Sequence, residues 1–598
     1  MKGISFFMIR NMWNNLRFKY HDFLWNMKRL ANDNDDVKIY YDAHYQSWPI
    51  NERAVLYEMQ DGQELDDSPF AILREWISSG ASIEHIIVAK ENEIDRINRV
   101  LKFWDLIERQ NIRVVIYESK EHMRWLLTAK YIITNAMIFS DIFVKRPGQI
   151  FVNTWHGTPL KKMGYAMPGG VMGSWNVIRN VLMTNYLILP NAYTAEIFKK
   201  DYRLDNLYTG RIILGGYPRN DILVTGLPKK QLQKFHDEIS LDSEKQLILY
   251  APTWSGDTTI IHSSSQELEV YLNTLESLSK IPNTIIIFKP HPYFQNAISL
   301  DRRFETYLIP DYFGTNVILS QVDLLITDYS SLFFDYLTTG RPIIFFDSKE
   351  NYQNERGTYL KISELPGPYT KEISSLIGLV QDIPSWHECY IDKYARFRQR
   401  FVSYEDGMSS QRMVDIIKSR SDEKSLSNET ILFNGEDFSD KNFTESHRKL
   451  VKRISLSYDI SVAIFESHVL EYWYGYQFFA NIDSVSKYTR VFVNKNSQHR
   501  RSGKTEVALN GRRMTAAKQF NMLVIPQSSF SYHQKELTST AEMIIMAKNP
   551  ARELWLLKIG FTRSLESKNW EVFGKGHHQN LEFAKNIMKM LEEKNVRL

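Results

Sequence analysis

The sequence predicts an α/β protein made of two Rossmann-like halves that face a cleft, followed by an α+β module rich in strands. Strands alternate with helices in two successive series, and strand–helix–strand units at this spacing form parallel sheets. A polar stretch then precedes a region of short, aromatic strands. The 598 residues leave room for about three domains at roughly 100–200 residues each.

The first series starts near residue 37, and its strands are short runs of β-branched and aromatic residues. The expected strands are Val37–Tyr41, Ala54–Tyr57, His85–Ala89, Ile112–Tyr117, Tyr131–Thr134, Gln149–Asn153 and Ile212–Leu214. Apolar residues at helical spacing predict helices at Pro69–Ser79, Glu91–Arg109 and Lys120–Thr128.

The second series starts near residue 245 and repeats the alternation. Its expected strands are Gln246–Tyr250, Thr284–Phe288, Asp323–Thr327 and Pro342–Phe346. Helices are expected between them at Gln266–Leu278 and Ser330–Thr339. Ligands of such sheets bind at the carboxyl ends of the strands. We therefore expect the functional residues in the loops that follow these strands.

The polar stretch around Ser419–Lys441 is typical of a domain boundary. Beyond it we expect a meandering sheet with strands at Ile454–Phe465, Glu471–Phe479, Thr489–Asn494, Thr505–Leu509 and Asn521–Ile525, and helices near Ala541–Lys548 and Asn580–Lys594. The predicted division is a basic amphipathic segment 1–35, an N-terminal half 36–240, a C-terminal half 241–418, a linker 419–447 and an accessory module 448–598.

Composition excludes several classes of protein. The 74 basic and 70 acidic residues give a net charge of +4, which offers no reason to expect nucleic-acid binding. The single cysteine, Cys389, excludes a disulfide framework and fits a reducing compartment. No apolar run reaches the roughly 18 residues of a transmembrane helix. Residues 1–35 combine basic and large apolar side chains, a pattern of a helix that lies on an anionic membrane or packs on the protein body.

The motif WHGTPLK follows the strand that ends at Asn153. His156 titrates near neutrality and can take a proton from a hydroxyl nucleophile. Gly157 lets a ligand approach the backbone, and Lys161 can face a phosphate. A structural histidine in a surface loop is the alternative, but the order His-Gly-Thr-Pro directly after a strand favours a functional loop.

Three further motifs follow strands. In KPHP, prolines stiffen the loop that presents Lys289 and His291, which favours a function. Arg219 of YPRND offers a fork of donors for a phosphate or carboxylate, and Thr253 and Trp254 of APTW offer a hydroxyl and an aromatic face. An ordinary turn and an ordinary strand exit are the alternatives for these last two motifs.

The motif TDYSSLFFDY ends a strand and opens a helix at Ser330 and Ser331. Free N–H groups and the positive dipole end at such a helix start attract phosphate, although a serine N-cap without a ligand is the alternative. Asp335 lies one turn further along. We expect Gly340 to end this helix.

Several motifs of other chemistries are missing from the sequence. It contains neither a GxxxxGKS/T phosphate loop nor a GxGxxG fingerprint, and no His/Cys/Asp cluster at metal-ligand spacing. Acidic pairs such as Asp66–Asp67 lie in a turn-like polar stretch and are expected to be solvated. We therefore expect a site without a metal, which uses histidines, lysine, arginine and a helix dipole.

Together and in this order, the motifs resemble the CDP-glycerol glycerophosphotransferase family, which includes teichoic acid polymerases of Gram-positive bacteria and related capsule polymerases. The resemblance covers about residues 40–415 and includes VLYE at Val55–Glu58 and SPFAI at Ser68–Ile72. It implies a GT-B-like fold with the acceptor in the N-terminal half and the donor in the C-terminal half. It implies transfer of an alditol phosphate, glycerol or ribitol phosphate, from a CDP-alditol to a polymer hydroxyl with release of CMP.

The resemblance also implies roles for individual residues. His156 matches the family's proposed catalytic base, and His291 matches a second histidine near the donor pyrophosphate. The positions that match substrate contacts are Trp155, Gly157, Thr158, Pro159, Lys161, Arg219, Thr253, Trp254, Lys289, Pro290, Ser330, Ser331 and Asp335. No metal and no cofactor are implied, because the CDP-alditol is a substrate.

The implied partners are the CDP-alditol, a lipid-linked saccharide or poly(alditol phosphate) acceptor and an anionic inner-leaflet surface, with no nucleic acid. They predict a peripheral protein at the cytoplasmic face of the cell membrane. The basic stretch Lys487–Arg513 fits a polyphosphate acceptor or a membrane, and equally a solvated surface.

Other functions stay open at the level of sequence. One is a primer that adds a single unit to a lipid-linked disaccharide, and another is a GT-B glycosyltransferase that uses a nucleotide sugar. A third is a scaffold without catalysis, against which the paired histidines argue. The basic accessory module favours a polymerase over a primer, while glycerol and ribitol donors fit equally.

Overall fold

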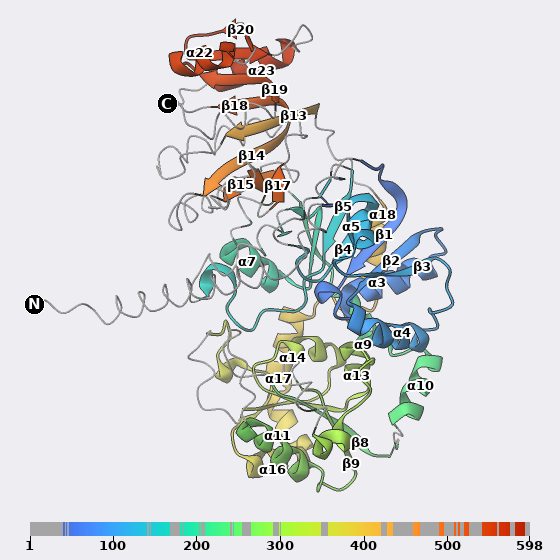
Figure 1. Ribbon diagram of the computed structural model, residues 1–598. Helices are drawn as coiled ribbons and strands as arrows, with labels where there is room; N and C mark the ends of the chain where they lie inside the picture. The colour runs from blue at the N-terminus through green and yellow to red at the C-terminus, as the bar shows by residue number, and fades with distance from the viewer. Residues whose placement is uncertain are drawn as a thin grey trace, which may run out of the picture.

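The computed structural model describes a few positions before residue 47, most of residues 47–419 and parts of 427–592. Its longest gaps up to residue 419, apart from the N-terminal segment, are 168–176, 254–264, 291–297 and 348–356. The described chain forms three sheets, which Figure 1 shows one above the next. Every strand pair in the first two sheets is parallel, which confirms the predicted α/β class.

The first sheet has seven strands in the order β3-β2-β1-β4-β5-β6-β7. They are β1 (Asn51–Glu58), β2 (Glu84–Ala89), β3 (Ile112–Ile116), β4 (Ala129–Thr134), β5 (Ile150–Asn153), β6 (Tyr186–Leu189) and β7 (Arg211–Leu214). The strand order reverses between β1 and β4, and such a reversal opens a crevice at the carboxyl edge of a parallel sheet. The loops after β1, β4 and β5 therefore leave the sheet around one crevice.

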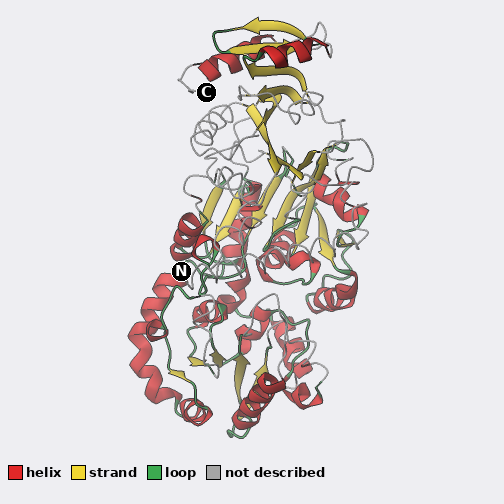
Figure 2. Ribbon diagram, turned by 60° about the vertical axis from the view of Figure 1, so that its left-hand side comes forward, coloured by secondary structure: helices red, strands yellow, loops and turns green. Residues whose placement is uncertain are grey.

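Helices cover both faces of the first sheet, as Figure 2 shows for the two parallel sheets. Val55 and Tyr57 of β1 pack with helices α3 (Asp67–Ser78) and α4 (Ile94–Phe103). Leu56 faces the other side, toward α5 (Lys120–Thr128), because successive strand residues point to opposite faces. Further elements of this half are α7 (Ala192–Asp201), the 3₁₀ turn η5 (Pro218–Asn220), α9 (Asp221–Thr225) and α10 (Lys229–Ile239).

One predicted element of the first series is wrong, and another is shorter than predicted. The segment Val37–Tyr41 is helical at its described positions and is not a strand, since residues 37, 40 and 41 pack on one core at helical spacing. The helix expected over Glu91–Arg109 begins as a 3₁₀ turn and its α-helical part ends at Phe103. Asp105, with φ +58°, takes a left-handed backbone conformation that stops a helix.

The second sheet has five strands in the order β12-β11-β10-β8-β9. They are β8 (Gln246–Ala251), β9 (Thr284–Phe288), β10 (Leu324–Thr327), β11 (Ile343–Phe346) and β12 (Tyr369–Thr370). One face packs on α11 (Ser265–Leu278) and α16 (Ile373–Gln381). The other packs on α13 (Thr315–Gln321), α14 (Leu332–Tyr336) and α17 (Ile383–Phe401).

The chain returns from the second sheet to the first through α18 (Ser409–Lys418). Met413, Val414 and Ile417 of this helix are buried in the core that contains Tyr57 of β1. Figure 1 shows α18 beside β1, far along the chain from it. The two halves are thus connected twice, once between α10 and β8 and once by this returning helix.

The third sheet is not the predicted meander. Its strands are β13 (Ser427–Asn434), β14 (Tyr458–Glu466), β15 (Arg490–Lys495), β16 (Val507–Leu509), β17 (Arg512–Met514), β18 (Phe520–Ile525), β19 (Ala541–Ala547), β20 (Thr562–Glu566) and β21 (Trp570–Gly574). The central order β15-β14-β13-β18-β19 is parallel, and antiparallel hairpins β16–β17 and β20–β21 extend its two edges. The parallel strands are joined by long connections rather than by tight turns, and their order reverses between β13 and β18.

Two further predictions about this region are wrong. The expected linker 419–447 contains β13, the central strand of the third sheet. This strand was missed because its apolar run is short and flanked by polar residues. The helix expected near Ala541–Lys548 is β19, because a short, continuous apolar run suits a buried strand as well as a helix. Two helices follow, α22 (Pro550–Lys558) and the expected C-terminal helix, α23 (Leu581–Glu592).

Some predictions fall outside the described residues, namely the segment 1–35 and the strand Glu471–Phe479. Within the described part of the chain, no helix has the length and apolar character needed to cross a membrane.

Candidate active site

His156 lies at the carboxyl edge of the first sheet, just beyond β5. Its Nδ1 is 2.7 Å from the carbonyl oxygen of Asn135, the residue that follows β4. A carbonyl only accepts, so Nδ1 carries the proton and Nε2 of the neutral ring keeps a lone pair. One side of the ring is exposed to solvent. The rest is buried among protein atoms, and this burial lowers the pKa of His156 below the ordinary value. His156 is therefore a neutral base at pH 7, able to accept a proton at Nε2.

The residue before this base has a strained backbone conformation. Trp155 has φ +53°, and its buried ring stacks on His156 with 4.1 Å between ring centroids. Five further non-glycine residues with positive φ follow strands of the same sheet, namely Gln60, Asp61, Asp67, Glu118 and Phe139, while Asp105 and Asn283 lie elsewhere. Such conformations cost about 1–3 kcal/mol each and persist where the surroundings impose them, often at functional sites.

The loop of His156 meets the start of α14 from the other half. A Cβ on Gly157 would lie 3.1 Å from Oγ of Ser331, so a glycine permits this close approach. Beyond it, the N–H of Lys162 donates to the carbonyl of Gly357 at 3.1 Å, and the N–H of Tyr359 donates to the carbonyl of Leu160 at 2.8 Å. The structure thus brings together the WHGTPLK and TDYSS motifs, which lie far apart in the sequence.

Arg219 links the two halves through a buried pair of carboxylates. Its Nη1 is 2.8 Å from Oδ1 of Asp67, and its Nη2 is 2.8 Å from Oδ2 of Asp335. The three side chains are only 8–10% exposed. Although burial opposes the charge, Asp335 and Asp67 raise the pKa of Arg219 above its ordinary value. The charges of Arg219 and Asp335, both predicted to contact substrate, are therefore matched within the protein.

The prediction that Asp66 and Asp67 are solvated is wrong. Oδ2 of Asp66 accepts the N–H of Thr315 at 2.9 Å, at the first residue of α13 in the second half. Asp67 is held by Arg219. Both acidic side chains have partners far away in the sequence. The local polar pattern does not reveal these partners and is therefore indistinguishable from that of an exposed turn.

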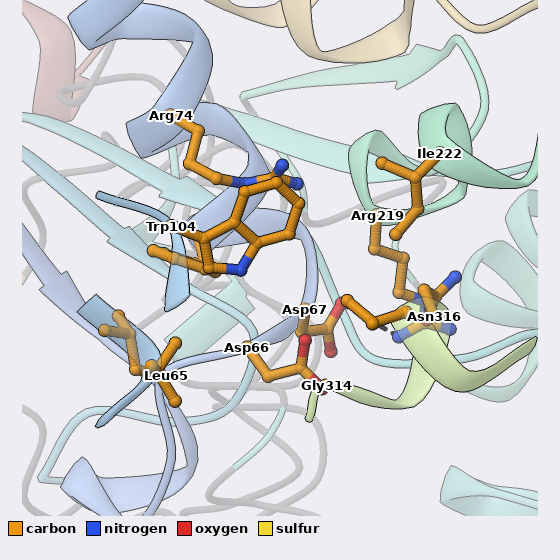
Figure 3. A pocket seen from close by; sticks show the side chains of 12 residues that line it. Leu65, Asp66, Asp67, Arg74, Trp104, Arg219, Ile222, Gly314 and Asn316 are labelled. Carbon is orange, nitrogen blue, oxygen red and sulfur yellow. Dashed lines mark hydrogen bonds and ion pairs between the residues drawn. The ribbon is translucent and has the colours of Figure 1, made fainter. Parts of the chain in front are cut away.

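A narrow crevice lies beside Arg219, between α3 and α4 of the first half and α13 of the second. Figure 3 shows Arg74 lying over the ring of Trp104, with Asp66 and Asp67 on the opposite wall. The guanidinium carbon of Arg74 is 3.7 Å from the ring centroid. Burial lowers the pKa of Arg74 to about 10, so it stays charged at neutral pH.

The carboxyl edge of the second sheet carries Thr253 and Lys289. The N–H of Thr253 donates to Oδ1 of Asp328 at 2.7 Å. Burial lowers the pKa of Lys289, and the nearby carboxylates of Asp66 and Glu64 act in the opposite direction. Burial and the neighbouring carboxylates of Asp66 and Asp67 raise the pKa of Glu64 to about 7. Pro290, which follows Lys289, is half-buried, whereas Trp254 and His291 lie outside the described residues.

The remaining predicted site residues contact the protein itself. Oγ1 of Thr158 accepts from Asn191 at 3.3 Å, and the carbonyl of Pro159 accepts from Tyr193 at 3.0 Å. Lys161 forms a backbone bridge with Thr358 of the second half.

At the α14 start, Oγ of Ser330 accepts the N–H of Leu332 at 3.3 Å. Gly340, with φ +74°, ends this helix after a 3₁₀ turn, as predicted.

Sequence reasoning missed Asn135, Asn220 and Glu405. Asn135 directly follows a strand of the parallel sheet, so its position was a usable signal. Nδ2 of Asn220 donates to Oδ1 of Asp335 at 3.1 Å and to Oε1 of Glu405 at 3.0 Å, and the N–H of Tyr217 also donates to Oε1 at 3.0 Å. No local pattern marks Glu405, which lies 185 residues from Asn220.

The buried carboxyl of Glu405 is expected to make stability depend on pH. Burial raises its pKa from 4.5 to about 8, so the folded protein keeps a proton that the unfolded chain loses. This stabilisation is complete below the unfolded pKa and is lost as the pH rises through the folded value. Glu405→Gln cannot ionise and keeps an acceptor oxygen for Tyr217. Its melting temperature should therefore fall less than that of wild type between about pH 5 and pH 8. An equal fall in both proteins contradicts the assignment, and the exposed Glu276→Gln is the matched control.

No group of three or more His, Cys, Asp or Glu side chains that could hold a metal ion occurs among the residues the structure describes. The expectation of a site without metal or cofactor stays a prediction.

The family model for CDP-Glycerol:Poly(glycerophosphate) glycerophosphotransferase matches residues 39–419. The chain belongs to this family. A teichoic acid poly(glycerol phosphate) polymerase of Bacillus spizizenii is 29% identical over 381 residues, which cover 61% of this chain and 92% of that protein. A teichoic acid glycerol-phosphate transferase of Staphylococcus aureus is 28% identical over 386 residues, covering 61% and 93%.

Solved structures of the family carry a similar fold. A structure of the wall teichoic acid polymerase TagF, a histidine-to-asparagine variant soaked with CDPG, matches with a TM-score of 0.56 and 26% identity. The match covers 67% of this chain and 97% of the TagF chain. Family members thus share the part of the chain that contains the first two sheets, whereas the family match ends before the third sheet.

Proposed function

We propose that this protein transfers an alditol phosphate from a CDP-alditol to the terminal hydroxyl of a growing teichoic acid-type polymer and releases CMP. The observation that carries the proposal is the position of His156. Its Nε2 is free to accept a proton, and its loop lies against Ser331 of the other half. A base from one half thus lies next to the helix start that the family resemblance assigns to the donor.

The reaction follows from this arrangement. The acceptor oxygen attacks the phosphorus that bears the alditol, a new P–O bond forms, and the bond from that phosphorus to the CMP oxygen breaks. His156 takes the hydroxyl proton. By the family resemblance, Lys289, His291 and the Ser330–Ser331 helix start would stabilise charge on the pyrophosphate and the departing CMP. Phosphoryl transfer depends mainly on such positioning and electrostatics.

The finer arrangement belongs to the same proposal. The two parallel sheets form a GT-B-like pair, with the acceptor on the half of His156 and the CDP-alditol on the half of Lys289. The acceptor is a lipid-linked saccharide or its growing polymer, so the protein works as a peripheral protein at the cytoplasmic face of an anionic membrane. The basic segment 1–35 supports this placement.

The deciding experiment measures CMP release and product length with purified protein and a short lipid-linked acceptor. CDP-glycerol, CDP-ribitol and UDP-sugars are compared. We expect CMP release from one CDP-alditol together with a ladder of phosphodiester-linked units. A single added unit would show a primer instead. UDP release without CMP would leave the fold in place and overturn the proposed chemistry.

A further inference from the structure

Asp67 contacts both Asn135, which holds His156, and Arg219, which joins the two halves. Its Oδ2 accepts a hydrogen bond from Nδ2 of Asn135 at 2.9 Å. Its Oδ1 accepts one from Nη1 of Arg219 at 2.8 Å. The backbone of Asp67 has φ +66°, and the side chain is 10% exposed. One carboxylate thus holds an amide of the first half with one oxygen and the inter-half guanidinium with the other.

Asn135 connects this carboxylate to the base. Its carbonyl is 2.7 Å from Nδ1 of His156, and its side-chain Oδ1 accepts the N–H of Gln60 at 3.2 Å. The backbone oxygen that fixes the imidazole therefore belongs to a residue whose side chain is tied on both sides. Movement of the Asn135 side chain would move this oxygen as well.

Arg219 connects the same carboxylate to the second half. Its other nitrogen holds Asp335 of α14 at 2.8 Å. Ser331 at the start of α14 in turn lies against Gly157, the neighbour of His156. The contacts form a closed ring from His156 through Asn135, Asp67, Arg219 and α14 back to the loop of His156.

We propose that Asp67 is a positioning residue for the base. Through Asn135 it fixes the imidazole with Nδ1 protonated and Nε2 free, and through Arg219 it makes that orientation depend on contact between the two halves. The inference rests on the proposed function, since it takes His156 as the base. It adds a residue that touches no substrate and still determines how well the base works.

The charges near His156 give this positioning role a measurable consequence, a change in the pKa of the imidazole. Two charged groups act on His156, Asp67 from the start of α3 and Arg219 from η5. The negative charge of Asp67 raises the pKa of His156, and the positive charge of Arg219 lowers it. Replacing Asp67 by a neutral residue of the same shape should therefore lower the pKa of His156. The acid limb of kcat/KM then moves to lower pH, which a purely structural defect would not produce.

The test compares Asp67→Asn, Asn135→Ala and the control Asp66→Asn in the full chain. Asp67→Asn should lose about 10²-fold in kcat through misplacement of the base, with little change in KM for the donor. Its acid limb should move to lower pH. Asn135→Ala should lose kcat similarly, while its limb moves less because no charge is removed. Asp66→Asn loses its contact to α13 and a charge near Lys289 and Glu64, but no charge that acts on His156, so it should keep the wild-type acid limb. Melting temperatures confirm that each variant is folded.

A second readout does not depend on activity. The ¹⁵N shifts of the imidazoles, with His156 assigned by comparison with His156→Gln, report its tautomer and pKa. We expect one tautomer in wild type, a mixture in Asn135→Ala, and a mixture with a lower pKa in Asp67→Asn. Unchanged His156 signals in a folded Asp67→Asn overturn the positioning role even if CMP is released. Failure of wild type to release CMP overturns the proposed function and leaves the imidazole measurement interpretable.

Discussion

His156→Ala is expected to lose about 10²–10⁴-fold in kcat while its melting temperature stays close to that of wild type. The imidazole is held by a single hydrogen bond to Asn135 and by stacking on Trp155, and it is open to solvent on one side. Its removal takes away the partner of one carbonyl, that of Asn135, and opens the space of an exposed ring, which water can fill. The loss should therefore appear in the chemical step rather than in folding.

The pH profile tests the same assignment. Because the pKa of His156 lies below the ordinary 6.5, the acid limb of kcat/KM in wild type should lie below that value. His156→Ala should lack this limb. His236→Ala, a partly exposed histidine on α10, is the matched control and should keep both rate and profile. A folded His156→Ala with near-normal turnover, or one that keeps the limb, would show that another group takes the proton.

The sequence predicts the parts of this protein that depend on local patterns. β1, β2, β3, β8, β9, β10 and β11 lie where β-branched runs predict them. The rule that ligands bind at the carboxyl ends of parallel strands places His156, Thr253 and Lys289 at two sheet edges, where the structure has them. The rule also places the motifs of Gly157 and Ser331 at such edges, and the structure adds that the two come into contact.

What the sequence does not reveal is pairing over long distances. Arg219 lies 152 residues from Asp67 and 116 from Asp335, and no periodicity links the three. Taken alone, Arg219 looks like a phosphate ligand and Asp67 like a solvated turn residue. The order of the third sheet is hidden for a similar reason, because parallel strands pair across long connections and nothing in a strand specifies its neighbour.

The variant Arg219→Met is expected to lower the free energy of unfolding by about 3–5 kcal/mol. The methionine fills similar space but leaves Asp67 and Asp335 as buried carboxylates without their common cation. Removing one partner of a buried ion pair costs more than replacing the whole group, because the remaining charge is no longer compensated. Denaturant unfolding measures the loss, and Arg303→Met, whose half-exposed ion pairs face solvent, should change stability little.

The triple variant Asp67→Asn, Arg219→Met, Asp335→Asn distinguishes a structural ion network from a phosphate ligand. If the loss in Arg219→Met comes from uncompensated charge, neutralising both carboxylates should recover much of the stability, since neutral groups of similar size replace a buried ion triad at low cost. Activity should stay low in the triple variant, because Asp67 no longer fixes Asn135 beside the base. An Arg219→Met protein of wild-type stability with a raised KM for the CDP-alditol would instead show that the guanidinium binds the donor and that the two carboxylates find other partners.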